Sequence, residues 1–236
     1  MAVQLKCGAV FLHIPKTGGS WVTKVFEALD LVGHEIGHKH SDMVRVLNEG
    51  RFGGFTQVVR DVVVPKLGKK ARELTAWPAA APTPVDGVYR FCFVRNTLNR
   101  YESWWKYESS HGWKTFGDVN NVEDWHPNAA LNGLGEDDFN TFMRNIVERY
   151  PGYVTELFGL YTQPGISYIG KQESLTDDLV HVLKHLNINF DEQQVRDMKP
   201  QNVSRAPKAP IAWDPALKSQ VERLEYAGLV RYGYAQ

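Results

Sequence analysis

The stretch Gly8-Ala-Val-Phe-Leu-His-Ile14, closed by Pro15 and followed by Lys-Thr-Gly-Gly-Ser20, decides the fold. Its first seven residues are almost continuously apolar, which is typical of a strand buried on both faces of a sheet. After the glycine turn, apolar residues recur at helical spacing from Trp21 to Leu29 until Gly33 stops the pattern. A buried strand, a glycine turn and a helix in this order predict an α/β domain that opens on a central parallel strand.

The composition of the chain excludes several classes of protein. Its 236 residues, 43% hydrophobic and 23% charged, predict a single globular domain over residues 1–236. With 27 basic and 27 acidic residues the formal net charge is zero, which argues against a general nucleic-acid binder. Cys7 and Cys92 cannot build a disulfide framework, so we expect a reducing, cytoplasmic location. The apolar run at residues 9–12 is too short to span a membrane and resembles no signal peptide, so we expect no membrane partner.

The rest of the chain predicts a parallel sheet flanked by helices. Strands are expected at residues 88–94 and 166–169. Helices are expected at residues 41–50 with Ser41 as cap, 97–109, 136–150, 175–186 with Ser174 and Asp177 at capping-box spacing, and from Pro215 with Asp214 as cap. Residues 55–64 fit either a strand or an amphipathic segment. Residues 75–88 are typical of a surface loop, and 111–135 lack any period and form a candidate functional loop.

The loop between the first strand and the first helix has the chemistry of an anion site. Gly18 and Gly19 let backbone N–H groups turn toward a ligand, and Lys16 adds a full positive charge at a helix N-terminus. The hydroxyls of Thr17 and Ser20 are further donors. The loop is not a Walker A motif, because Lys16 precedes both glycines. The alternative is a tight turn with an exposed lysine.

A second segment, Phe91-Cys-Phe-Val-Arg95 followed by Ser103 eight residues on, places an arginine where a strand ends. That end is the usual ligand edge of a parallel sheet. Side chains of a helix lean toward its N-terminus, so the Ser103 hydroxyl can share an anion with Arg95. The alternative for Arg95 is a solvated or salt-bridged helix cap.

Taken together, the two segments resemble the sulfotransferases that use 3′-phosphoadenosine 5′-phosphosulfate (PAPS) and release adenosine 3′,5′-bisphosphate (PAP). The resemblance implies a P-loop-NTPase-like sulfotransferase fold, and transfer to a hydroxyl, or an amine, of a small-molecule or carbohydrate acceptor. It implies that Lys16 contacts the phosphosulfate bridge, and that Arg95 and Ser103 bind the 3′-phosphate. The 5′-phosphate would be surrounded by Thr17, Gly18, Gly19 and Ser20. Trp21 resembles a tryptophan that stacks on adenine, with packing in the core as its alternative.

The histidine-rich stretch His34-Glu-Ile-Gly-His-Lys-His40 supports two interpretations. It contains the zinc-protease pattern H-E-x-x-H at His34, Glu35 and His38, which requires a helix that the neighbouring glycines disfavour. This leaves a zinc hydrolase as an alternative, and a non-catalytic nucleotide-binding module as another. The preferred interpretation needs no metal. In it the stretch resembles the region where sulfotransferases place a general base, with His40 first and His38 and Glu35 behind it.

The sequence also offers a candidate wall for the acceptor. Aromatic residues gather on and after the helix that follows Arg95, namely Trp104, Trp105, Trp113 and Trp125. Indole rings suit sugar or aromatic surfaces, and buried packing is the alternative.

Overall fold

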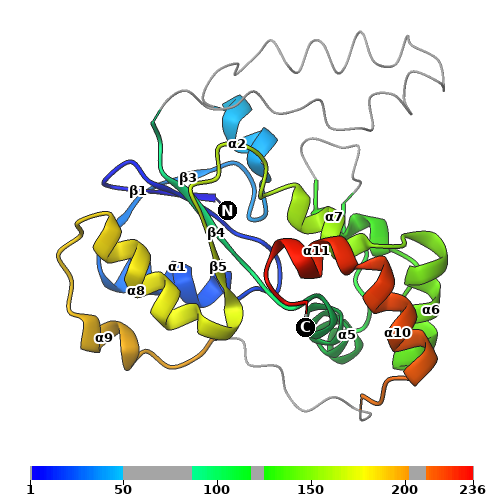
Figure 1. Cartoon of the computed structure of the whole chain (residues 1–236). Coiled ribbons are helices and arrows are strands. Elements are labelled where there is room, and N and C mark those ends of the chain that lie inside the picture. Colours follow the sequence, from blue (N-terminus) through cyan, green and yellow to red (C-terminus); the bar gives the residue numbers. More distant parts are fainter. Residues whose placement is uncertain (1, 50–86, 118–124, 202–210, 236) are drawn as a thin grey trace, which may run out of the picture.

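Five strands form one mixed sheet with helices on both faces in the computed structural model, which describes residues 2–49, 87–117, 125–201 and 211–235 (Figure 1). The strands lie in the order β3-β1-β2-β4-β5. Their bounds are Ala2–Leu5 (β1), Val10–Leu12 (β2), Val32–Ile36 (β3), Arg90–Val94 (β4) and Tyr168–Lys171 (β5). The α/β class with flanking helices is confirmed.

The expectation of a wholly parallel sheet is wrong. Strands β2, β4 and β5 are parallel, with Phe11 opposite Phe91 and Phe91 opposite Tyr168, but β1 is antiparallel to both of its neighbours, β2 and β3. The reason is the short connection from β1 to β2. The N–H of Leu5 donates to the Ala9 carbonyl at 2.8 Å and Gly8 adopts φ +89°, so the chain reverses within a few residues. A parallel pair needs a much longer crossover.

The strand β3 was also not expected. Helix α1 (Gly19–Ala28) ends before the predicted stop, and Asp30 takes a left-handed conformation with φ +51°. Gly33 then lies inside β3, where a Cβ atom would press on the backbone carbonyl of Gln4 across the strand pair. The glycine that signals a helix end in the sequence therefore serves close strand pairing instead.

Alternating side chains of the central strands build two separate cores, one on each face of the sheet. Val10, Leu12, Cys92 and Val94 join the larger cluster, whereas Phe11, Phe91 and Phe93 join the smaller one. This alternation is the two-residue period of strands that are buried on both faces. In Figure 1, α1, α8 (Leu175–His185) and α9 (Glu192–Arg196) cover the smaller cluster.

The larger cluster lies against the remaining helices, on the other side of the sheet (Figure 1). These are α2 (Met43–Glu49), α5 (Thr97–His111), the 3-10 turn η3 (Pro127–Leu131), α6 (Phe139–Arg149), α7 (Tyr153–Gly159), α10 (Pro215–Leu224) and α11 (Tyr226–Arg231). A short turn, η4 (Gln172–Ser174), leads into α8. No helix of the described residues is long and apolar enough to cross a bilayer.

Most of the predicted helices are present, but only some of the predicted N-cap residues cap them. Asp214 caps α10 as expected, accepting from the N–H groups of Ala216 and Leu217. Ser174 does not cap α8, because its hydroxyl donates to Asp178 at 2.9 Å. Asp42, and not Ser41, accepts the N–H of Arg45 at the start of α2. The expectations for residues 55–64 and 75–86 and part of the loop at 111–135 lie outside the described residues.

A buried carboxylate joins the C-terminal helices to the core. Glu225 is fully buried and accepts from the Tyr101 hydroxyl at 2.5 Å and from the N–H groups of Val154 and Thr155 at 3.0 and 2.8 Å. The two N–H groups belong to the first turn of α7, which has no side-chain cap of its own. Glu225 lies at the junction of α10 and α11, and it therefore accepts the hydrogen bonds of N–H groups that would otherwise be unpaired at the N-terminus of α7.

We predict that Glu225→Ala lowers the free energy of unfolding by about 3 kcal/mol, because it leaves buried donors without an acceptor. For a chain of this length the loss corresponds to roughly 6 to 12 °C in the midpoint of thermal unfolding. The matched control is Glu222→Ala, since Glu222 is half-exposed and pairs with the side chain of Lys218 at 3.9 Å. Equal midpoints for the two variants would contradict this account of Glu225.

Candidate anion site

The loop after β2 is built by two unusual backbone conformations. Lys16 has φ +68° and Gly18 has φ +88°, and both lie in the left-handed region. Lysine pays a steric cost of roughly 1 kcal/mol there, whereas glycine does not. Gly19 is needed for a different reason, since a Cβ atom at this position would overlap the ring of His13. The sequence Lys-Thr-Gly-Gly thus produces a tight turn that leads directly into α1.

This turn leaves backbone donors free at the start of α1. Within the described part of the chain, no acceptor contacts the N–H groups of Gly18, Gly19 or Ser20. The first N–H groups of any helix lack an internal partner, and together they carry a partial positive charge. Thr17 differs from the expectation, because its buried hydroxyl already donates to the Ile14 carbonyl at 3.0 Å. Only its backbone N–H remains for a ligand.

The side chain of Lys16 lies over the ring of Tyr107, with Nζ 4.0 Å from the ring centroid. Burial, together with the nearby charges of Arg100 and Arg95, lowers the pKa of Lys16 from its usual 10.5 to about 8. The carboxylate of Glu108 acts in the opposite direction. An ammonium group held among other cations gains more from a bound anion than one in water.

Arg95 meets Lys16 across the ends of two parallel strands. Its Nη1 donates to the Lys16 carbonyl at 3.5 Å, and its Nε is buried without a partner among the described residues. Burial lowers the pKa of Arg95, while the charges of Glu173 and Glu102 oppose the change. Arg95 follows the fully buried β4, and the side chain of Asn96 caps the next helix, α5. The structure therefore brings Lys16 and Arg95 to one edge of the sheet.

Ser103 and Trp21 are both largely buried. Ser103 lies on α5 and is 9% exposed, and its hydroxyl makes no hydrogen bond with another described residue. Trp21 is 5% exposed in the smaller core cluster, and its indole N–H donates to the Met198 carbonyl at 3.2 Å. Core packing, the alternative for Trp21, is therefore what the structure contains, and stacking on a base stays a prediction. The site as a whole thus rests on Lys16 and Arg95.

Arg100 is a cation of this region that the sequence analysis missed. It is fully buried on α5, and its Nη2 donates to Asn128 Oδ1 at 2.7 Å. Within the described ranges its Nε and Nη1 have no hydrogen-bond partner, and no carboxylate there forms an ion pair with it. Its charge acts on both Lys16 and His126, which places it beside the loop. Buried guanidinium groups are normally paired, so Arg100 leaves the region with an excess of positive charge.

Glu108 is a second residue that was missed. It is fully buried, one turn beyond Trp104 on the same helix face as Arg100. Its Oε2 accepts from the N–H of Lys114 at 3.1 Å, and its Oε1 has no partner in the described part of the molecule. Burial raises its pKa. Charged residues at positions 100 and 108 on an otherwise aromatic helix face were the available signal, because such positions rarely hold charge without a role.

The histidines divide into a column of one buried and two half-buried rings and an exposed group. The ring of His40 lies 4.7 Å from that of His13 and 5.1 Å from that of His126, centroid to centroid. His40 Nδ1 is 3.0 Å from the His13 carbonyl at the start of the loop. Burial lowers the pKa of all three, to about 3 for His13, to about 4 for His126, and well below the usual value for His40. His126 was not expected in the site.

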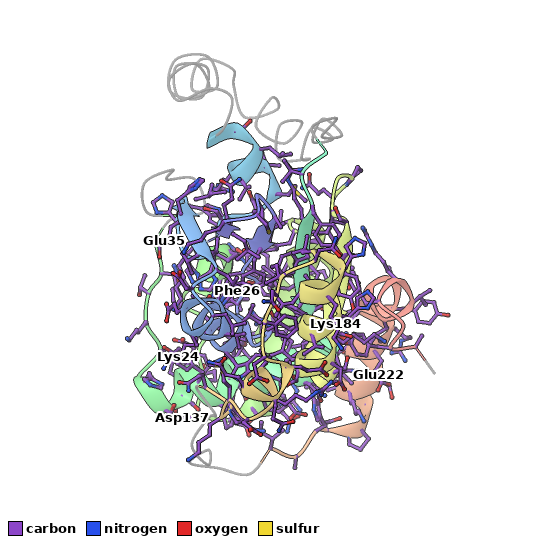
Figure 2. The ribbon with its side chains drawn as sticks, turned by 90° about the vertical axis from the view of Figure 1, so that its left-hand side faces the viewer. Lys24, Phe26, Glu35, Asp137, Lys184 and Glu222 are labelled. Carbon is purple, nitrogen blue, oxygen red and sulfur yellow. The ribbon has the colours of Figure 1, made fainter. Side chains whose placement is uncertain are left out.

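The other two candidates for the general base, Glu35 and His38, lie elsewhere. Glu35 is exposed on the strand β3 (Figure 2), and His38 is exposed in the turn that follows. The zinc alternative needs His34, Glu35 and His38 on a helix, but residues 32–36 form a strand, so His34 and Glu35 point to opposite sides. Among the described residues no group of three His, Cys, Asp or Glu side chains is placed to hold a metal ion.

The aromatic wall expected for an acceptor is mostly core. Trp104, Trp105 and Trp125 are buried, and only Trp113 is half-exposed. The half-exposed ring that does face the histidines is Phe116, which stacks on His126 at 4.3 Å and 19° and also contacts Trp104 at 5.3 Å. The segment after α5 therefore contributes to the site through Phe116 and His126. Its residues 118–124 lie outside the described chain.

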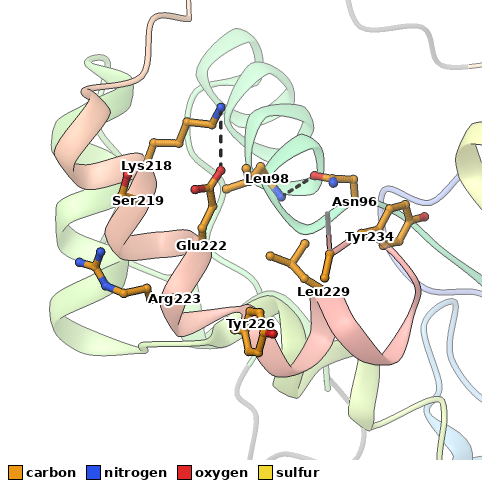
Figure 3. Close-up of a pocket in the computed structure, with 10 residues that line it drawn as sticks. Asn96, Leu98, Lys218, Ser219, Glu222, Arg223, Tyr226, Leu229 and Tyr234 are labelled. Carbon is orange, nitrogen blue, oxygen red and sulfur yellow. Dashed lines mark hydrogen bonds and ion pairs between the residues drawn. The ribbon is translucent and has the colours of Figure 1, made fainter.

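A cavity of about 780 Å³ opens between α5 and the C-terminal helices (Figure 3). It is lined by Asn96, Leu98, Lys218, Ser219, Glu222, Arg223, Tyr226, Leu229, Tyr234 and Ala235. Asn96 is the neighbour of Arg95 in sequence, but Lys16, Arg95 and the histidine column do not line this cavity. The cavity therefore adjoins the candidate anion site through Asn96 and Tyr234, which interacts electrostatically with Arg95, but the loop does not form its wall.

Comparison with known proteins adds no relative: no family model matches the chain, and no curated protein or solved structure is significantly similar to it. The site therefore has to be interpreted from its own geometry.

We predict that sulfate binding weakens about tenfold between pH 7 and pH 9, because Lys16 loses its proton with a pKa of about 8. Sulfate keeps its double charge over this range, so the change reports the protein alone. The measurement is the dissociation constant from calorimetry at fixed ionic strength. Lys16→Met should bind weakly at both pH values, and a wild-type dissociation constant that does not change with pH would contradict the assignment.

Proposed function

We propose that the chain is a PAPS-dependent sulfotransferase that transfers the sulfuryl group to a hydroxyl acceptor. The observation that carries the proposal is the meeting of Lys16 and Arg95, with the free N–H groups at the start of α1, at the carboxyl edge of β2 and β4. PAPS carries a 5′-phosphosulfate and a 3′-phosphate, so it needs cationic groups at two neighbouring points. The two cations here come from two different segments of the chain, as the resemblance implies.

The proposed roles of the loop residues follow from their positions. The N–H groups of Gly18, Gly19 and Ser20 would hold the 5′-phosphate at the helix N-terminus. Lys16 would lie at the bridging oxygen and offset the charge that develops there as the bond from sulfur breaks. Arg95 would bind the 3′-phosphate, with the Ser103 hydroxyl as a second donor. A bound donor also places negative charge beside Arg100, which has no carboxylate partner among the described residues.

His40 is the proposed general base. A carbonyl oxygen can only accept, so the contact with His13 O requires the proton on His40 Nδ1 and leaves the lone pair on Nε2. This tautomer can take the proton of an acceptor hydroxyl while its oxygen forms a bond to sulfur and the sulfur–oxygen bond to the phosphate breaks. The low pKa of His40 in the free protein would rise when an anionic donor binds nearby, toward the range in which a base works efficiently.

The first test is thermal unfolding with adenosine 3′,5′-bisphosphate and with 5′-AMP. At about a hundred times its dissociation constant, the bisphosphate should raise the midpoint by roughly 5 to 10 °C, and 5′-AMP should have much less effect. Arg95→Ala should remove the difference between the two nucleotides, and Lys16→Met should weaken both. The exposed Lys24 on α1 (Figure 2) and the exposed Arg149 on α6 provide matched controls. A midpoint that neither nucleotide moves would overturn the proposal.

The second test addresses chemistry separately from binding. We predict that His40→Ala lowers the rate of sulfuryl transfer by roughly 10² to 10⁴, because the acceptor loses its base, while the midpoint shift with the bisphosphate is unchanged. Transfer is measured with ³⁵S-labelled PAPS and a panel of hydroxyl compounds. His34→Ala, at an exposed position on β3, is the control. Bisphosphate binding by the wild type with no turnover of any acceptor would indicate a non-catalytic nucleotide-binding module instead.

A further inference from the structure

His126 is fixed in position and in tautomer by its surroundings. It precedes η3, and its Nδ1 accepts the backbone N–H of Asn128 at 3.1 Å. Asn128 is itself fully buried, and its Oδ1 accepts from Arg100 at 2.7 Å and from the Tyr153 hydroxyl at 2.7 Å. On its face, His126 stacks on Phe116. Because Nδ1 accepts a hydrogen bond, the proton of the neutral ring must lie on Nε2.

His40 and His126 therefore present opposite hydrogen-bonding groups. His40 donates from Nδ1 to the His13 carbonyl, so its Nε2 is an acceptor, whereas His126 accepts at Nδ1, so its Nε2 is a donor. Their ring centroids are 5.1 Å apart with the planes at 87°. No hydrogen bond joins the two rings among the described contacts, and both side chains are half-exposed. Each ring thus keeps one nitrogen available for a ligand.

A hydroxyl group is the functional group that matches this pair. Its hydrogen can be donated to His40 Nε2 while its oxygen accepts from the Nε2 proton of His126. An ether oxygen can only accept, and a protonated amine can only donate, so each satisfies one of the two histidines. A site built to hydrogen-bond a hydroxyl discriminates against such analogues because one of its polar groups then lacks a partner.

We propose that His126 is a binding residue for the acceptor, and that His126 and His40 together select a hydroxyl group by their opposite tautomers. The inference rests on the proposed function for the identity of the reaction, but the hydroxyl preference follows from the two histidines themselves. In the reaction, His40 Nε2 takes the proton and the His126 donor holds the oxygen toward the sulfur.

The tautomers are tested directly by nitrogen NMR of the full chain labelled with ¹⁵N-histidine at pH 7. We expect His40 with its proton on Nδ1 and His126 with its proton on Nε2, assigned by comparison with His40→Ala and His126→Leu. The same tautomer in both residues would overturn the inference, whatever the activity of the protein.

The hydroxyl preference is tested with phenol and methyl glucoside as probes, and with anisole as the matched compound that lacks a hydroxyl. Phenol or methyl glucoside should move the Nε2 resonances of both histidines, and anisole should move at most that of His126. If all three compounds shift the two Nε2 resonances to the same extent, the inference fails, even if the bisphosphate binds. A missing bisphosphate shift with a selective hydroxyl response would instead overturn only the proposed sulfotransfer.

Turnover variants separate binding by His126 from a purely structural role. His126→Leu should lower kcat/KM for the hydroxyl acceptor by about a hundredfold, with a large part in KM, since it removes the donor and disturbs the orientation of the hydroxyl. His126→Gln can supply an amide N–H, so it should recover about tenfold of the loss. His181→Gln, at an exposed position on α8, is the control. Equal losses for Leu and Gln, or a smaller bisphosphate shift in both, would assign His126 a structural role and contradict the inference.

Discussion

The buried positive charge of Arg100, which pairs with none of the described carboxylates, is the constraint on which the rest of the site depends. The guanidinium of Arg100 is fully buried and donates to the side chain of Asn128. Its charge lowers the pKa of Lys16, and the carbonyl of Lys16 accepts a hydrogen bond from Arg95. Like charges held close together in a poorly solvated region repel one another, and the fold keeps them there only because many packed residues surround them. An anion relieves this repulsion. The arrangement is therefore consistent with a site that is completed by a doubly or triply charged ligand.

The sheet explains why these charges come from distant parts of the sequence. Strands β2 and β4 are parallel neighbours in register, so the residues that follow them meet at one edge. Lys16 follows β2 and Arg95 follows β4, and α5 then returns Arg100 and Glu108 to the same region. The antiparallel β1 and the outer β3 extend the sheet beyond β2 and contribute neither Lys16 nor Arg95. His34 and Glu35 consequently lie on β3, away from the loop, whereas the ring of His40 contacts the His13 carbonyl at the start of the loop.

The sequence predicts the parts of the fold that depend on local pattern. The apolar runs of β2 and β4 and the periodic faces of α1, α5 and α10 could be recognised, and so could the glycine turn and the cations at residues 16 and 95. The antiparallel β1 could not, because its four residues carry no alternation that distinguishes them. Arg100, Glu108 and His126 were missed because their importance depends on burial and on contacts formed only in the fold, such as that of Arg100 with Asn128 and that of His126 with Phe116. For Trp21 the sequence pattern fits two roles, stacking on a base and packing in the core, and the structure contains the packing.

A crystal structure of the chain with adenosine 3′,5′-bisphosphate tests the central claim most directly. The account predicts one phosphate within hydrogen-bond distance of Lys16 Nζ and of the N–H groups of Gly18 to Ser20, and the other against the Arg95 guanidinium. A nucleotide bound instead in the cavity between α5, α10 and α11, or with its phosphates in solvent, would contradict it.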